Sequence, residues 1–213
     1  MLFNYCIERY GKIMSLSSSP LVSVGVPVYN SESTLRDALE SLLNQTYTNI
    51  QLVISDNFST DATASLCREY QAKDKRVIFH QQKSNIGMTE NFDFVLKNST
   101  GDFFMWAAGD DVRSQNFIEV NLQHLLRDPN CVASTSPNIH EDQAHETKNF
   151  VTYSLEGTRT VRFKSFFQLP GASHGIFYSL MRTSTIKSCP FVSSKFFWGW
   201  DWAIILFLSL IHI

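Results

Sequence analysis

The sequence has few charged residues and no long run of positive charge. Of its 213 residues 18% are charged, and the formal net charge at pH 7 is −2. Nucleic-acid-binding chains carry a basic patch that neutralises phosphates, and this sequence has none, so we exclude nucleic acid as a partner. The apolar share of 44% is typical of a globular chain with a sizeable buried core.

Cysteine is scarce, and long apolar runs are missing. The cysteines are widely separated and form no CxxC pair: Cys6, Cys67, Cys131 and Cys189. This pattern favours reduced thiols in a reducing compartment. The longest apolar run, Ala203 to Ile211, has about half the length of a membrane-spanning helix. No signal-peptide pattern opens the chain. We therefore expect a cytoplasmic protein without a transmembrane segment, and peripheral association with the inner face of a membrane stays open.

Two widespread nucleotide-binding motifs are also absent. Neither the GxGxxG dinucleotide fingerprint nor the GxxxxGK[ST] phosphate loop occurs, which argues against a dinucleotide oxidoreductase and a P-loop NTPase. The stretch "HEDQAH", His140 to His145, resembles a zinc-protease motif but spaces its histidines by five residues. That spacing takes them off one helix face, so a solvated loop is the better interpretation.

An alternation of strand and helix patterns is present instead. Valine at every second position predicts a strand over Leu21–Val28, and leucines at helical spacing predict a following helix with Ser31 as its N-cap. The other expected strands are 50–55, 76–81, 103–107, 131–136 and 175–182. The other expected helices are 61–71, 89–98, 116–127 and 163–168, with an irregular polar stretch at 137–160. This order predicts an α/β fold with a mostly parallel sheet flanked by helices.

Polar residues follow each of the first four expected strands. They are Pro27–Asn30, Ser55–Asp61, Lys83–Gly87 and Ala108–Asp111. In open α/β sheets, ligands bind at the carboxyl ends of the strands, and three of these four ends carry polar groups that suit a nucleotide and its phosphates. The adjacent carboxylates of Asp110 and Asp111 repel each other unless a solvated turn or a bound cation relieves the repulsion.

Two blocks of the sequence resemble family 2 glycosyltransferases. They are "VSVGVPVYNSESTLRDALESLLNQTYTNIQLVISDNFSTDAT" (Val22–Thr63) and "KSNIGMTENFDFVLKNSTGDFFMWAAGDD" (Lys83–Asp111). A later stretch, "WGWDW" around Asp201, is similar to the family's further acidic motif. The resemblance implies a GT-A fold, which is a Rossmann-like sheet. It also implies inverting transfer of a sugar from a nucleoside diphosphate to an acceptor hydroxyl.

The resemblance implies nucleotide-binding roles for particular residues. Pro27, Tyr29 and Asn30 would frame the nucleobase pocket. Asp56 would accept a hydrogen bond from the ring N–H of the base, which favours UDP or dTDP as the nucleotide. Asp61 would cap the following helix or support its loop. The ribose and phosphate side would be lined by Lys83, Asn85 and Gly87.

The resemblance also implies a metal ligand and a base. Asp110 matches the final carboxylate of the family's DxD motif and would bind Mg²⁺ or Mn²⁺ at the diphosphate, as part of the nucleotide site. Ala108 replaces the motif's first carboxylate, which puts a ribose or sugar contact in doubt. Inversion by single displacement needs one general base, and Asp201 is the candidate for this catalytic role.

Structural roles stay open for several of these residues. Asp56 and Asp61 also fit turn or N-cap positions, and Lys83 fits an ordinary surface position. Asp201 also suits a structural role, as a carboxylate at a helix N-terminus. The neighbouring tryptophans, Trp198, Trp200 and Trp202, could be buried core residues or could stack against sugar rings.

The chain is divided by these patterns. Residues 1–20 are expected to be a disordered or non-native leader, with Met14 as an alternative start. Residues 21–136 form the nucleotide-sugar-binding half, 137–207 an incomplete acceptor-side half, and 208–213 a non-native tail. We expect such a truncated chain to transfer sugar weakly or not at all.

The expected acceptor is a saccharide or lipid-linked saccharide, in bacterial-type synthesis of cell-surface polysaccharide or glycoconjugate. One alternative is a non-catalytic nucleotide-binding or interaction domain of the same fold. Another is a nucleotidyltransferase, but that class needs a glycine-rich, arginine-bearing loop after the first strand. The sequence "VPVYNSE" has neither feature.

Overall fold

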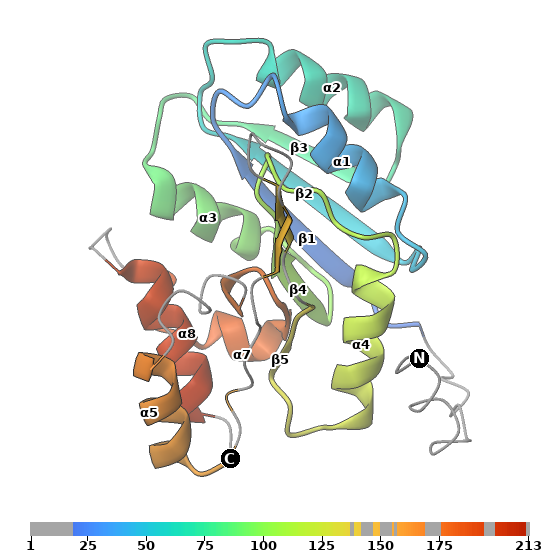
Figure 1. Cartoon of the computed structure of the whole chain (residues 1–213). Helices are drawn as coiled ribbons and strands as arrows, with labels where there is room; N and C mark the ends of the chain where they lie inside the picture. Colours follow the sequence, from blue (N-terminus) through green and yellow to red (C-terminus); the bar gives the residue numbers. More distant parts are fainter. Residues whose placement is uncertain are drawn as a thin grey trace.

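A six-stranded sheet forms the centre of the protein (Figure 1). The computed structural model describes residues 19–136, 139–141, 147–149, 155, 157–168, 176–193 and 199–211. The strand order is β3-β2-β1-β4-β8-β5. The strands of this sheet are β1 (Val22–Val28), β2 (Ile50–Asp56), β3 (Val77–Gln81), β4 (Phe103–Trp106), β5 (Ala133–Ser134) and β8 (Leu180–Arg182). The first four pair in parallel, and β8 lies antiparallel between β4 and β5, which confirms the predicted mostly parallel α/β sheet.

Helices cover both faces of this sheet (Figure 1). They are α1 (Leu35–Leu43), α2 (Thr63–Lys73), α3 (Met88–Lys97), α4 (Phe117–Arg127), α5 (Arg159–Gln168), α7 (Thr183–Lys187) and α8 (Trp200–Ile211). A separate hairpin is formed by β6 (Ile139–Glu141) and β7 (Thr147–Asn149). Within the described ranges, no helix has both the length and the apolar character that crossing a membrane requires.

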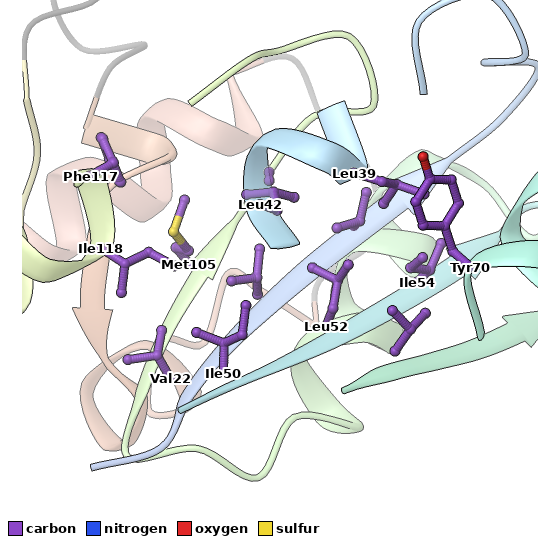
Figure 2. Close-up of a cluster of buried hydrophobic side chains, with 14 of the residues drawn as sticks. Val22, Leu39, Leu42, Ile50, Leu52, Ile54, Tyr70, Met105, Phe117 and Ile118 are labelled. Carbon is purple, nitrogen blue, oxygen red and sulfur yellow. The ribbon is translucent and has the colours of Figure 1, made fainter. Parts of the chain in front are cut away.

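The period of two along the strands divides the core between the two faces. On β4, Phe103 and Met105 belong to one cluster, with α1, α2 and α4, whereas Phe104 and Trp106 belong to the other, with α3, α5, α7 and α8. Figure 2 shows the first cluster, in which Met105 lies beside residues of β1, α1 and α4. All four β4 side chains are buried, as expected for a strand covered on both faces.

The strand order indicates which edge of the sheet would bind a ligand. The chain builds β2 and β3 on one side of β1 and then crosses to β4 on the other side. The helices that follow β1 and β4, α1 and α4, pack in the same core cluster, and the loops that lead to them lie together at the carboxyl end of the sheet, where ligands of open α/β sheets bind. β1, β2 and β3 end level, because Val28 pairs with Asp56 and Asp56 pairs with Gln81.

Two sequence-based predictions about local structure are wrong. Ser31 is not the N-cap of the first helix, which begins at Leu35 after Thr34. The Ser31 hydroxyl donates to the Tyr29 carbonyl at 3.4 Å, and the Ser31 N–H donates to Oγ1 of Thr63, the first residue of α2, at 2.8 Å. The strand expected over 175–182 is reduced to β8, because residues 176–177 are helical and Phe177 stacks on Trp106.

Three other predicted elements differ in extent. The strand expected at 131–136 is only Ala133–Ser134, and the helix expected at 163–168 begins at Arg159. The stretch 137–160, expected to be irregular, contains the β6–β7 hairpin. The leader residues 1–18 and the last two residues of the expected tail lie outside the described residues.

Candidate active site

Asp56 is the last residue of β2 and is fully buried. Its Oδ1 accepts hydrogen bonds from the Ser59 backbone N–H at 3.1 Å and from the Ser59 hydroxyl. Oδ2 is 3.4 Å from the same N–H and keeps lone pairs for another donor. The structure thus gives Asp56 a turn-stabilising role, and a base that bonds to it must displace the groups that cover it.

The loops after β1 and β2 are held together by hydrogen bonds. Asn30 donates its backbone N–H to Ser59 Oγ at 2.9 Å and accepts the Thr60 N–H at its side-chain oxygen at 2.9 Å. Asp61 accepts the Glu32 N–H at 3.1 Å, and Thr63 N–H at 3.0 Å. Burial raises the pKa of Asp61, but these hydrogen bonds outweigh it and the pKa is lowered. The predicted loop-supporting role of Asp61 is confirmed.

Asn57 fixes the loop after β3, a role that the sequence analysis missed. This side chain is buried, and its oxygen accepts the Ile86 N–H at 2.8 Å. Its amide donates to Asn85 Oδ1 at 3.0 Å and to the Gly87 carbonyl at 3.1 Å. The available signal was an amide directly after the last residue of a buried strand. Gly87, with φ of 100°, precedes the first residue of α3 in a conformation that favours glycine.

The other predicted nucleotide contacts lie around the same edge. Tyr29 follows β1 and is 50% exposed, whereas Pro27 is a half-buried residue within β1. Lys83 is exposed and, within the described part of the chain, makes no hydrogen bond or ion pair. The structure therefore gathers the loops after β1, β2 and β3 and leaves Lys83 in solvent.

The loop after β4 packs against the loop after β1. Thr34 Oγ1 donates to the Gly109 carbonyl at 2.8 Å. A Cβ at Gly109 would lie 3.1 Å from Val28 Cγ1, so a small residue suits this contact. Asp110, the next residue, is exposed, and its carboxylate has no hydrogen bond or ion pair to any described residue.

Asp111 is arranged differently from its neighbour. Its Oδ2 forms an ion pair with Arg113 Nη2 at 3.2 Å. The Arg113 side chain is mostly buried, and its guanidinium lies 5.5 Å from the centroid of the Phe117 ring. Arg113 therefore relieves part of the repulsion between the two carboxylates from within the chain. Asp110 is the one left unpaired.

Tyr178 connects this loop with Asp201. Burial, reinforced by the negative charges of Asp111, Asp110 and Asp201, raises the pKa of the Tyr178 hydroxyl to about 12. The Arg113 guanidinium, 5.9 Å from the Tyr178 ring centroid, acts in the opposite direction. The charges of three carboxylates, two from the loop after β4 and one from α8, thus act on one phenol.

Asp201 lies in the first turn of α8 and is half-buried. A helix N-terminus stabilises a carboxylate, so the structural role and the proposed base role are compatible. Its neighbour Trp200 is a core residue that donates its ring N–H to the Phe191 carbonyl at 2.7 Å. Trp202 is 39% exposed and contacts Phe166 edge to face. Trp198 lies outside the described residues.

These residues fit a metal ion that takes most of its ligands from elsewhere. Among the described residues, no three His, Cys, Asp or Glu side chains gather into a potential metal site. Asp110 offers one unpaired carboxylate, and Mg²⁺ commonly binds one or two carboxylates with the rest of its shell from phosphates and water. His145 of the zinc-like stretch lies outside the described residues.

Comparison with known proteins decides the family. Residues 23–185 match the model of glycosyl transferase family 2. The chain belongs to this family. The chain is 28% identical over 178 residues to glycosyltransferase GlyA of Streptococcus pneumoniae, covering 84% of this chain and 24% of GlyA. It therefore spans about a quarter of that relative's length.

Solved structures of glycosyltransferases share the fold. S. aureus TarS 1–349 superposes with a TM-score of 0.66 at 18% identity, covering 90% of this chain and 55% of TarS 1–349. A complex of the same fragment with UDP-GlcNAc gives a TM-score of 0.59 at 20% identity. The match covers 78% of this chain and 46% of the chain in the complex. The mannosyltransferase PcManGT from Pyrobaculum calidifontis, in complex with GDP-Man and Mn²⁺, gives a TM-score of 0.57 at 17% identity. The match covers 80% of this chain and 47% of PcManGT. The likeness to these structures shows that the chain has the GT-A fold.

Proposed function

We propose that the chain carries the donor site of an inverting glycosyltransferase that uses UDP- or dTDP-sugars. The observation that carries the proposal is the unpaired, exposed carboxylate of Asp110 at the carboxyl end of β4, beside the loop of β1. An uncompensated negative charge at the crevice where α/β folds bind ligands suits a cation bound with an anionic diphosphate. TarS in complex with UDP-GlcNAc and PcManGT in complex with GDP-Man and Mn²⁺ support the same ligand class.

In this proposal Asp110 and Asp201 have different roles in the reaction. Asp110 would hold Mg²⁺ or Mn²⁺, which when bound supplies positive charge that stabilises the departing diphosphate. Asp201 takes the proton of the acceptor hydroxyl while the acceptor oxygen bonds to the anomeric carbon and the bond to the diphosphate breaks. Displacement from the opposite face inverts that carbon. The charges of both carboxylates raise the pKa of the Tyr178 hydroxyl, which supports their action in one site.

The remaining residues would bind and orient the nucleotide. Tyr29, Asn30 and Pro27 belong to the base side, and Asn85, Gly87 and Lys83 to the ribose and phosphate side. The acceptor class in this proposal is a saccharide or lipid-linked saccharide of a surface polysaccharide or glycoconjugate. The reaction would take place in the cytoplasm or at the inner face of the membrane.

Nucleotide preference is the first expected result. Because Asp56 accepts hydrogen bonds and a pyrimidine N3–H donates one, UDP should bind at least about 10-fold more tightly than GDP or ADP in the presence of Mn²⁺. Asp56→Asn should reduce that ratio. Isothermal calorimetry with each nucleotide measures it, with Asp102→Asn as a control at the opposite edge, where Asp102 accepts the Leu21 N–H. Tighter binding of GDP would contradict the assignment.

A direct test of the activity uses the donor alone. The intact protein should release UDP from a UDP-sugar slowly, with water as the acceptor, and only with a divalent cation. Binding of UDP without its release from any sugar nucleotide would favour the alternative, a non-catalytic binding domain. Ala108, which replaces the first carboxylate of the DxD motif, is the feature of the sequence that supports this alternative.

A further inference from the structure

Phe58 has an unusual backbone and an unusual exposure. Its φ is 66°, in the left-handed region, and its side chain is 49% exposed. A bulky residue in that region is a genuine outlier, whereas asparagine, as at Asn30 with φ of 49°, tolerates it. Neither core cluster of the described residues includes Phe58, so packing in the interior does not explain the aromatic ring.

The residues on both sides of Phe58 are fixed by hydrogen bonds. Asn57 before it holds the loop of Asn85 and Gly87, and Ser59 after it bonds to Asp56 and accepts the Asn30 N–H. The backbone between two such anchors has little freedom, and an unfavourable φ persists only where the surroundings impose it. Glycine or asparagine would meet this φ at lower cost. The sequence nevertheless places an exposed phenylalanine there.

The position of Phe58 suggests what the ring contacts. It lies two residues after Asp56, in the loop that is bonded to the loop of Tyr29, and Tyr29 is 50% exposed. Two half-exposed aromatic side chains thus accompany the buried Asp56 carboxylate at the carboxyl edge of the sheet. Aromatic side chains stack on nucleobases with little regard for which base is present.

We propose that Phe58 packs against the nucleobase of the donor and supplies affinity that does not depend on the base, while Asp56 selects the base. This inference rests on the proposed function, because it assumes that a nucleotide binds at this edge. It separates two contributions to one subsite. Loss of the Phe58 ring should weaken all nucleotides alike, and loss of the Asp56 carboxylate should change their ratio.

The test compares Phe58→Asn with the parent protein. Asparagine tolerates the left-handed conformation, so the melting temperature should stay within about 3 °C. The Kd for UDP and the Kd for GDP should both rise about 10-fold, with their ratio unchanged. Affinity for ribose 5-phosphate, measured by competition, should not change, because it has no base. Phe58→Trp, which keeps a ring, should bind UDP within a few-fold of the parent.

Three outcomes overturn the inference. Phe58→Asn that binds UDP as the parent does would show that the ring makes no contact. Equal weakening of UDP and ribose 5-phosphate would show that the change acts on the loop; Phe58→Gly, which also fits a φ of 66°, repeats the measurement if Phe58→Asn is unstable. A parent protein that binds neither UDP nor GDP overturns the proposed function itself, and the stacking role with it.

Discussion

Asp110→Asn should slow the Mn²⁺-dependent release of UDP from a UDP-sugar by about 10²- to 10³-fold. The amide has nearly the same shape but no charge, so it binds a divalent cation poorly and leaves the departing diphosphate uncompensated. Asp110 has no partner among the described residues, so the substitution breaks no contact there and should not unfold the protein. The measurement is the initial rate of UDP release across a range of Mn²⁺ concentrations.

Asp111→Asn is the matched control for this variant. It removes the same charge one residue later, but Asp111 is already paired with Arg113 at 3.2 Å. We expect less than about a 10-fold loss of rate, together with a small loss of stability of up to about 1 kcal/mol, since its partner is mostly buried but Asp111 itself is 42% exposed. A larger loss for Asp111→Asn than for Asp110→Asn would exchange the roles of the two residues.

Asp201→Asn should lower turnover by about 10²-fold or more while the affinity for UDP stays within a few-fold. A general base acts on the acceptor, so its loss changes the transition state and leaves donor binding nearly intact. Rates of UDP release and calorimetric UDP titration on the same preparation separate the two effects. Asp102→Asn, at the amino end of β4, serves as the control and should change neither. Normal turnover by Asp201→Asn would mean that another group is the base.

The elements from β1 to α4 could be predicted because their signals are local. Valines at alternate positions over Val22–Val28 and the leucines of α1 sit in one continuous pattern each, and the structure confirms both elements. The carboxyl-edge loops followed from the parallel order of the strands. Loop residues at that edge, including Asp110, therefore came together as the sequence pattern predicted, although their roles in binding stay predictions.

The second half was harder because its structure depends on distant partners. Phe177 stacks on Trp106 in the second core cluster, with ring centroids 4.8 Å apart, and residues 176–177 are helical where the sequence suggested a strand. Ser31 was also predicted wrongly: its hydroxyl donates to the Tyr29 carbonyl at 3.4 Å, and the helix has no side-chain cap. The N-cap pattern does not specify how far the turn after Ser31 extends before the helix begins at Leu35.

Two features of the site were invisible for the same reason. Asn57 binds Asn85 and Gly87, which belong to a loop on the other side of β3, and nothing in the spacing links them. Tyr178 lies far along the sequence from Asp110, yet the charges of Asp111, Asp110 and Asp201 all contribute to the raised pKa of its hydroxyl. Such groupings become apparent only when the antiparallel strand β8 takes its place beside β4.

The most direct test of the central claim is a calorimetric titration of UDP into the intact protein, with Mn²⁺ and then with EDTA. The account predicts that UDP binds at least about 10-fold more tightly with Mn²⁺, that Asp110→Asn abolishes this gain, and that Asp111→Asn keeps most of it. UDP affinity that is the same with Mn²⁺ and with EDTA, or a full Mn²⁺ effect in Asp110→Asn, would contradict a metal-assisted donor site at the end of β4.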